Sequence, residues 1–167
     1  LDKSSKKLCG KFRKGHFEGV LNVVNRFIEI IKPRYIYLGK KDYQQLYLIK
    51  KHIEKKKIKS KIIECKIIRE NNGIACSSRN LNLNKYQMMV ASNIFYYLNN
   101  LKKNIVKNYN LFKIDKIKKD LINLGAKKID YVENYNVKSF KKIKKPYNKF
   151  NLFIAYYIKN IRLIDNI

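Results

Sequence analysis

Hydrophobic residues recur every three or four positions in the first amphipathic segment of the chain, residues 17 to 31. One face of a helix passes through positions i, i+3, i+4 and i+7, so this spacing predicts a helix with an apolar stripe. The stripe consists of Phe17, Val20, Leu21, Val24, Phe27, Ile28 and Ile31. Gly15 and His16 lie at the predicted start, and Pro33 ends the helix because proline has no N–H to donate.

A strand–helix–strand unit is predicted directly after this helix. Residues 34–38 (RYIYL) are short, apolar and β-prone, which predicts a buried strand, and residues 61–65 (KIIEC) predict the next strand. Between them, Leu46, Ile49 and Ile53 form the apolar face of a helix. Two strands joined by one helix are expected to lie parallel in one sheet, with a right-handed crossover.

The start of that helix carries the spacing of a capping box. Asp42 can accept a hydrogen bond in the first turn, and Gln45 lies three residues later, where its amide can reach back. In this interpretation Gln44 faces solvent. His52, among lysines in the middle of the helix, is predicted to be exposed.

The pattern after Asn80 predicts two helices followed by strands. Asn84 can cap a helix that runs to about Leu101, and a second helix is predicted over residues 115–124, where Gly125 ends it. The buried face of the first is predicted to hold Tyr86, Val90, Ile94, Tyr97 and Leu101. Strands are predicted at residues 128–135 and 150–157 and at the terminal RLIDNI, with a basic loop at residues 141–146. The fold class is therefore α/β followed by a small α+β part, divided near residues 81–83.

The composition is strongly basic. Lys and Arg number 39 against 12 Asp and Glu, which gives a formal net charge of +27. Such a charge is typical of proteins that bind nucleic acid or another anionic surface. Coding bias is the other interpretation, since the excess is mostly Lys scattered among Ile, Asn and Tyr, with no Trp. An anionic substrate fits the charge as well.

The cysteines and histidines argue against a metal site. Cys9, Cys65 and Cys76 share no metal-ligand spacing, and His16 and His52 are the only histidines. An odd number of cysteines without a framework suits a reducing cytosol, which predicts a cytoplasmic protein. No apolar run reaches the roughly 18 residues of a membrane span. The chain starts without an apolar signal core or an initiator Met, which suggests a fragment.

Three polar segments could bind an anion, and each has a plainer interpretation. In the turn at residues 39–42, Lys41 could reach a phosphate and Asp42 a ribose hydroxyl, or the turn could simply cap a helix. Residues 76–80 offer hydroxyls, a guanidinium and an amide to phosphate oxygens, or form a polar interdomain loop. Residues 11–16 precede a helix N-terminus that favours an anion, or form a basic loop before a cap.

Taken in order, these segments resemble the pantoate–β-alanine ligase (pantothenate synthetase) family. Residues 8–20, LCGKFRKGHFEGV, are similar to the family's L-x-G-x-x-R-P-G-H-F-x-G-V. Residues 38–45, LGKKDYQQ, are similar to F-G-E-K-D-x-Q-Q, and residues 68–80, IRENNGIACSSRN, to V-R-E-x-D-G-L-A-x-S-S-R-N. The ending RLIDNI also looks like the family's ending. Three motifs at the right spacings make the resemblance specific.

The resemblance implies the C-terminal portion of an ATP-dependent ligase. Residues 1–82 would be the second half of a Rossmann-like parallel-sheet nucleotide-binding domain, and residues 83–167 a small α+β C-terminal lid domain. The family joins pantoate to β-alanine through a pantoyl-adenylate intermediate, is related to class I tRNA synthetases, and uses ATP with Mg²⁺. A homodimer is implied by the same resemblance, and neither a membrane nor a nucleic acid is an expected partner.

Site residues are carried over from the family position by position. The implied ATP site comprises Gly39, Lys40, Lys41, Asp42, Ile68, Cys76, Ser77, Ser78 and Arg79. Lys41 and Arg79 are the implied catalytic residues: Lys41 neutralises the phosphates, and Arg79 closes over them with the two serines. Gln45 and His16 are implied to bind pantoate. No resident metal site is expected.

The chain departs from the family pattern at four positions. Lys40 stands where the family has Glu, Lys14 where it has Pro, Cys76 where it has Met, and Asn72 where it has Asp. The family's H-x-G-H motif lies upstream of all these segments, so the 167 residues alone are expected to be inactive, with the strand at residues 34–38 exposing an apolar edge. The alternative is a small basic RNA-binding or ribosomal protein, which would gather Lys and Arg on one face.

Overall fold

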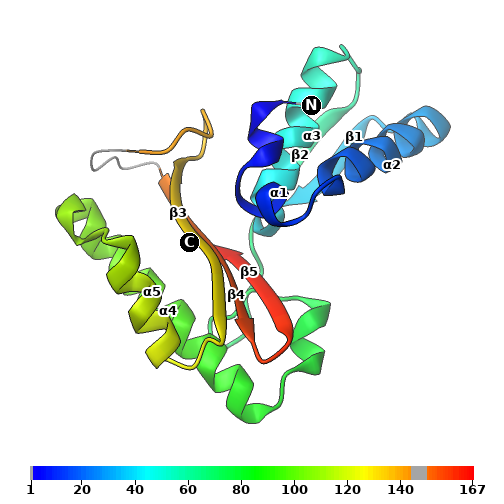
Figure 1. The fold of residues 1–167 in the computed structure, drawn as a ribbon. Helices are drawn as coiled ribbons and strands as arrows, with labels where there is room; N and C mark the ends of the chain where they lie inside the picture. The colour runs from blue at the N-terminus through cyan, green and yellow to red at the C-terminus, as the bar shows by residue number, and fades with distance from the viewer. Residues whose placement is uncertain (1, 144–149) are drawn as a thin grey trace. The chain divides into compact units, whose positions relative to one another are not determined.

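The computed structural model describes residues 2–143 and 150–167, and these residues form two compact units. The first unit is Leu1–Ile67 and the second is Ile68–Ile167. The first appears in blue to cyan in Figure 1, and the second runs from cyan-green to red. Each unit has its own core and is described by itself.

The first unit contains the predicted strand–helix–strand. After a 3₁₀ turn (Lys3–Lys6) and the short helix α1 (Leu8–Phe12) come α2 (His16–Ile31), β1 (Tyr35–Gly39), α3 (Tyr43–Lys55) and β2 (Lys61–Cys65). The two strands pair in parallel, with Tyr35 opposite Lys61 and Gly39 opposite Cys65. Leu21, Ile49 and Ile53 form the buried centre, against which apolar residues of both strands pack. The parallel pairing and both strand positions are confirmed.

The apolar stripe of α2 is only partly buried. Phe17 and Leu21 are buried, whereas Phe27 and Ile31 are more than half exposed. The prediction that residues 34–38 form a buried strand is also wrong for the described residues, since Tyr37 of β1 is 67% exposed. Alternate residues of β1 point away from α2 and α3, and the described residues put nothing over that face. Among the described residues β1 pairs with β2 alone, so its other edge is open, as expected from the sequence.

The start of α3 differs from the predicted capping box. Residues 40–42 form a 3₁₀ turn (Lys40–Asp42) ahead of the helix, and the Asp42 side chain makes no capping hydrogen bond. Asp42 is still the N-cap residue, but without that bond. Gln44 is buried and Gln45 is half-buried, so the prediction that Gln44 faces solvent is wrong.

The second unit is a three-stranded antiparallel sheet with two helices packed against it. Its elements after the loop are a 3₁₀ turn (Ser78–Asn82), α4 (Lys85–Lys107), a 3₁₀ turn (Tyr109–Leu111), α5 (Ile114–Asn123), β3 (Lys128–Asn136), β4 (Phe150–Ile158) and β5 (Ile161–Asn166). The strand order is β3-β4-β5. The main core joins Ile94 and Leu98 of α4 to Leu121 of α5 and to Val132 and Ile154 of the sheet.

Local signals set the ends of these helices. Asn84 and Gln87 form a reciprocal capping box at the start of α4, with both bonds at 2.9 Å. Gly125 ends α5 at φ +108°, a conformation that L side chains rarely adopt. The helix α4 runs past the predicted Leu101 to Lys107, and Tyr86 is exposed, so it does not belong to the buried face. Lys144, Lys145 and Pro146 of the predicted basic loop lie outside the described residues.

The division between the units falls at Ile67–Ile68 and not at the predicted residues 81–83. Residues 68–82 pack with the antiparallel unit because their side chains bond to β5. Arg69 reaches Asp165 at 2.7 Å, and Arg79 reaches the carbonyl of Arg162 at 2.7 Å. The loop that looked like a linker is part of the second unit.

Replacing Ile94 with alanine should destabilise the second unit by about 2–5 kcal/mol, because the side chain is buried between helix and sheet and its loss leaves a cavity. Met89 lies on the same helix and is half exposed, so Met89→Ala is the matched control. Urea unfolding followed by circular dichroism measures both. Equal losses of unfolding free energy would contradict the assigned core.

Candidate active site

The turn at the carboxyl end of β1 presents two lysines. Gly39 is the last residue of the strand, and Lys40, Lys41 and Asp42 form the 3₁₀ turn that leads into α3. The ammonium of Lys41 lies 3.5 Å from the Asp42 carboxylate. An ideal Cβ on Gly39 would meet nothing within 4 Å, so the backbone beside these lysines is open to a ligand.

Glu64 organises the lysines beside this turn. It lies on β2 opposite Leu38, next to the end of β1. Its carboxylate accepts a hydrogen bond from the Lys50 ammonium at 2.6 Å and forms an ion pair with the Lys40 ammonium at 3.2 Å. The Lys50 hydrogen bond is the main reason that the pKa of Glu64 lies below its usual range, and Lys40 lowers it further against the effect of burial. Lys40, which stands where the resemblance expects Glu, is thus paired with an acid from the neighbouring strand.

His16 and Gln45, the two predicted pantoate-binding residues, line one cavity of about 700 Å³. His16 begins α2 and Gln45 lies in the first turn of α3. Arg13 and Gly15 line the same cavity, and Arg13 donates a 2.8 Å hydrogen bond to Nε2 of His16. The structure therefore brings together basic, imidazole and amide groups above the apolar side chains of α2, which suits a small polar carboxylate.

Gln44 has a structural role that the sequence analysis missed. Its amide nitrogen donates to the carbonyls of Ser4 at 2.8 Å and Lys7 at 2.7 Å, and its oxygen accepts from the N–H of Cys9 at 3.1 Å. These three bonds hold the N-terminal turn against α3. Of the two adjacent glutamines, Gln44 bonds to the N-terminal segment, and Gln45 lines the cavity that contains His16. No local signal distinguishes them, because the partners of Gln44 lie 35 to 40 residues away in the chain.

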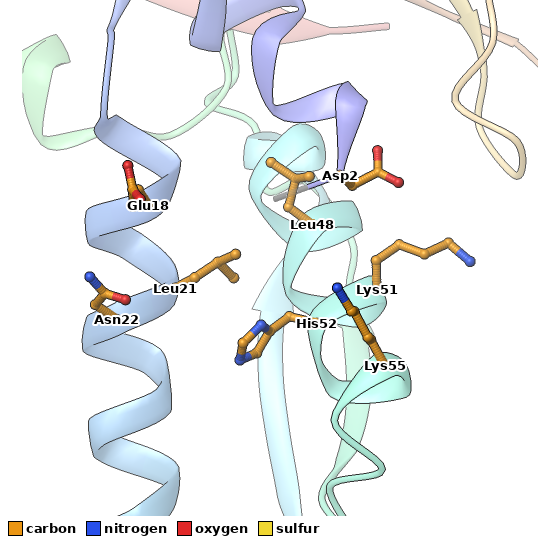
Figure 2. Close-up of a pocket in the computed structure, with 8 residues that line it drawn as sticks. All are labelled: Asp2, Glu18, Leu21, Asn22, Leu48, Lys51, His52 and Lys55. Carbon is orange, nitrogen blue, oxygen red and sulfur yellow. The ribbon is translucent and has the colours of Figure 1, made fainter.

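A second cavity of about 400 Å³ lies between α2 and α3 (Figure 2). Glu18, Leu21 and Asn22 of α2 line it together with Leu48, Lys51, His52 and Lys55 of α3. In Figure 2, Leu21 and His52 point into the space between the helices, and Lys51 extends away from α2. His52 is half-buried and its Nε2 lies 2.8 Å from Oδ1 of Asn25, so the prediction of an exposed histidine is wrong. Burial, and then nearby lysines, lower the pKa of His52. The packing of α2 beside α3 creates this environment.

In the second unit, the predicted phosphate-binding residues lie on an exposed loop. Cys76, Ser78 and Arg79 are exposed and Ser77 is half-buried. Ser77 caps the 3₁₀ turn by accepting the N–H of Arg79 at 3.3 Å. Ile68, the remaining predicted ATP-site residue, is 69% exposed at the start of this unit. The loop offers hydroxyl and guanidinium donors to solvent, as an anion-binding segment requires.

The predicted site residues thus form three groups: residues 39–42 with Glu64, the cavity of His16 and Gln45, and residues 76–79. The first two lie in the first unit, and the third lies with Ile68 in the second. Among residues 2–143 and 150–167, no three His, Cys, Asp or Glu side chains gather as ligands for a metal ion.

Comparison with known proteins identifies the family. The sequence profile described as Pantoate-beta-alanine ligase matches residues 1–167. The chain belongs to the pantoate–β-alanine ligase family. It is 38% identical over 161 residues to the pantothenate synthetase of Flavobacterium psychrophilum, and 40% identical over 164 residues to that of Caldicellulosiruptor saccharolyticus. These alignments cover 95% and 96% of the chain.

Solved structures of the pantoate–β-alanine ligase family are similar to the whole of this chain. A crystal structure of the Francisella tularensis enzyme, complexed with beta-gamma ATP and beta-alanine, is 33% identical with a TM-score of 0.77. It is matched over 100% of this chain and 56% of its own. Pantothenate synthetase from Thermus thermophilus has a TM-score of 0.84 at 22% identity over 98% of this chain and 60% of its own, which shows the shared fold.

The chain spans little more than half the length of the pantoate–β-alanine ligases that it matches: 57% of the Flavobacterium protein and 58% of the Caldicellulosiruptor protein. The described residues contain no helix whose length and apolar character would allow it to cross a bilayer.

Replacing Glu64 with glutamine should remove a pH-dependent contribution to stability. A carboxyl whose pKa is lowered in the folded state stabilises the fold above its ordinary value of 4.5 and loses that effect as the pH falls through the folded pKa. The wild type should therefore exceed Glu64→Gln in unfolding free energy at neutral pH, and the difference should shrink below pH 4.5. Urea titrations across this range measure it.

Glu54→Gln is the control, because Glu54 pairs with Lys51 on the exposed surface of α3. A pH-independent difference for Glu64→Gln, or the same profile in both variants, would contradict the role of Glu64 between the two lysines.

Proposed function

We propose that the enzyme to which these residues belong condenses pantoate with β-alanine in an ATP-dependent reaction that gives pantothenate. The observation that carries the proposal is the family match over residues 1–167, together with the exposure of Ser78 and Arg79 among the predicted donors. The similar Francisella tularensis enzyme was crystallised with beta-gamma ATP and beta-alanine. Pantoate, β-alanine and ATP are accordingly the proposed substrates.

The reaction proceeds in two balanced steps. A carboxylate oxygen of pantoate attacks the α-phosphorus of ATP, and the bond to the leaving pyrophosphate breaks, which gives pantoyl adenylate. The amine of β-alanine then attacks the acyl carbon and loses a proton, and the bond to AMP breaks. In both steps negative charge moves onto phosphate oxygens, so positioned cations and hydrogen-bond donors supply most of the rate enhancement.

Lys41 and Arg79 are the proposed catalytic residues. Lys41 leaves the carboxyl end of β1, where the open backbone at Gly39 leaves room for a nucleotide, and its ammonium would offset charge on the phosphates. Arg79, Ser77 and Ser78 would donate to the phosphate oxygens. The other proposed ATP-site residues are Lys40 and Asp42 of the first unit and Ile68 and Cys76 of the second. Mg²⁺ would arrive bound to ATP as part of the substrate.

The cavity of His16 and Gln45 is the proposed pantoate site. Gln45 offers an amide to the hydroxyls of pantoate, and Arg13 and His16 lie beside it to receive the carboxylate. The apolar residues Val20, Val23 and Val24 line the same cavity and suit the dimethyl carbon of pantoate. The polar groups of pantoate would therefore contact Arg13, His16 and Gln45, and its dimethyl carbon the valines of α2.

We infer a homodimer from the family resemblance, and a cytoplasmic location from an odd number of cysteines whose spacing forms no disulfide framework. The net charge of +27 does not require a nucleic-acid partner, because the lysines are spread over α1, α3, α4, α5, β2 and β3, in both units. An RNA-binding function has no specific site to support it in the described residues.

Replacing Lys41 with alanine in the complete enzyme should slow adenylate formation by about 100-fold or more. Loss of a charge beside the transferring phosphate costs on the order of 3 kcal/mol of transition-state stabilisation. The measurement is pyrophosphate release from ATP and pantoate, with circular dichroism to confirm the fold. Lys56→Ala, an exposed lysine at the end of α3, is the control. Near-normal pyrophosphate release by Lys41→Ala would refute the assignment.

Hydrogen exchange of residues 74–82 should slow when a non-hydrolysable ATP analogue binds, since the exposed donors of this loop would become ordered on the phosphates. Residues 150–158 of β4 serve as the internal reference, because β4 is the central strand and pairs with both β3 and β5. Equal exchange of residues 74–82 with and without the analogue would favour a purely structural loop.

A further inference from the structure

The loop of residues 76–79, here called the donor loop, is bracketed by two buried residues that bond to each other. Ala75 precedes it at 4% exposure and Asn80 follows it at 7%. The side-chain amide of Asn80 donates to the carbonyl of Ala75 at 3.1 Å and to the carboxylate of Glu70 at 2.6 Å. The exposed donors therefore lie on a short loop whose two ends are joined inside the protein.

Chemistry fixes the orientation of the Asn80 amide. Both of its close partners, the Glu70 carboxylate and the Ala75 carbonyl, are acceptors, so the nitrogen must face them. The amide oxygen then points elsewhere, and it is buried without a hydrogen-bond partner among the described residues. Leaving this oxygen without a partner costs free energy, and the two bonds that the amide nitrogen makes offset that cost.

The segment before the donor loop is rigidly anchored. The guanidinium of Arg69 makes two bonds to Asp165, at 2.7 and 3.1 Å, and one to the carbonyl of Gly73 at 3.0 Å, and it lies 4.4 Å from the centre of the Phe95 ring. Gly73 has φ +85°, and a Cβ there would lie 2.3 Å from Phe95. Arg69 is thus occupied by the fold, which leaves Arg79 as the guanidinium of this segment that is exposed for an anion.

We propose that Glu70, Ala75 and Asn80 form a neck that positions the donor loop, and that Asn80 is a positioning residue for the phosphates of the nucleotide. This inference rests on the proposed function for its ligand, but the neck itself is a property of the second unit. The neck fixes both ends of the loop while Ser78 and Arg79 stay exposed. Because the loop is already restrained before an anion binds, less conformational entropy is lost on binding.

Asn80→Asp tests the neck most directly. The substitution keeps the size of the side chain but sets a carboxylate against Glu70 and the Ala75 carbonyl, so both bonds are lost. The amides of Cys76 and Asn80, which donate to the carbonyls of Ile68 and Ser77, should then exchange about tenfold faster or more, since a hydrogen bond to a charged acceptor is lost. The amides of α4 should not change.

Asn82→Asp is the matched control, because Asn82 is exposed two residues further along the same 3₁₀ turn and the charge change is identical. The double variant Glu70→Gln with Asn80→Asp allows the new amide at position 70 to donate to the new carboxylate at position 80, which restores one of the two bonds. It should recover part of the lost protection, as a general loss of folding would not.

The experiment measures amide exchange by NMR in the 167-residue chain and affinity for a non-hydrolysable ATP analogue in the complete enzyme, each as the wild type and the three variants. The expected result is faster exchange at Cys76 and Asn80, and about tenfold weaker analogue binding, in Asn80→Asp but not in Asn82→Asp. Unchanged exchange in Asn80→Asp overturns the neck whatever the nucleotide does. Faster exchange with undiminished affinity overturns the positioning role. Failure of the analogue to protect residues 76–79 in the wild-type complete enzyme counts against the proposed function, and the exchange data on the 167-residue chain still decide the neck.

Discussion

The ion pair between Arg69 and Asp165 is the interaction on which the placement of residues 68–82, including the donor loop, depends. It joins side chains 96 positions apart, with two nearly parallel bonds between a planar guanidinium and a carboxylate. The same guanidinium holds the carbonyl of Gly73, so the turn that leads to the donor loop is fixed to β5. Because both side chains are mostly buried, removing either would leave a charge without its partner. This pair explains why residues 68–82 belong to the second unit.

A comparable arrangement orders the positive charge of the first unit. Glu64 receives Lys40 and Lys50 at the carboxyl end of the parallel strands, and Asp42 lies beside Lys41. Twelve acidic residues cannot pair with 39 basic ones, so where the acids lie decides which lysines are held in place. At the strand ends they hold the lysines that the proposed reaction uses. On the helices, Lys51 pairs with Glu54 on the exposed surface of α3, and other helix lysines such as Lys55 are exposed to solvent.

Local patterns were enough to predict most elements, and long-range packing accounts for the misses. The period of the apolar residues predicted α2, and short apolar, β-prone runs predicted both strands of the parallel pair. The cap at Asn84 was confirmed, and the structure adds Gln87 as the second half of a capping box. The capping box at Asp42 failed because a 3₁₀ turn intervenes. Gln44 and His52 were misplaced because their partners come from the N-terminal turn and from α2. Nothing within a few residues of either position carries that information.

The sequence by itself determined the family and the order of its motifs, because spacing along the chain survives without any knowledge of packing. It also determined which residue types could meet phosphates: Lys41 at a strand end and the hydroxyls with Arg79 in a loop. Only the tertiary structure decided that Arg69 pairs with Asp165 while Arg79 stays exposed. It also decided that Gln45 shares a cavity with His16, and that Asn80 bonds to Ala75 across the ends of the donor loop. These outcomes depend on which carbonyls and carboxylates the fold brings within hydrogen-bonding distance, and the partners of Arg69 and Gln44 come from segments that are remote in the chain.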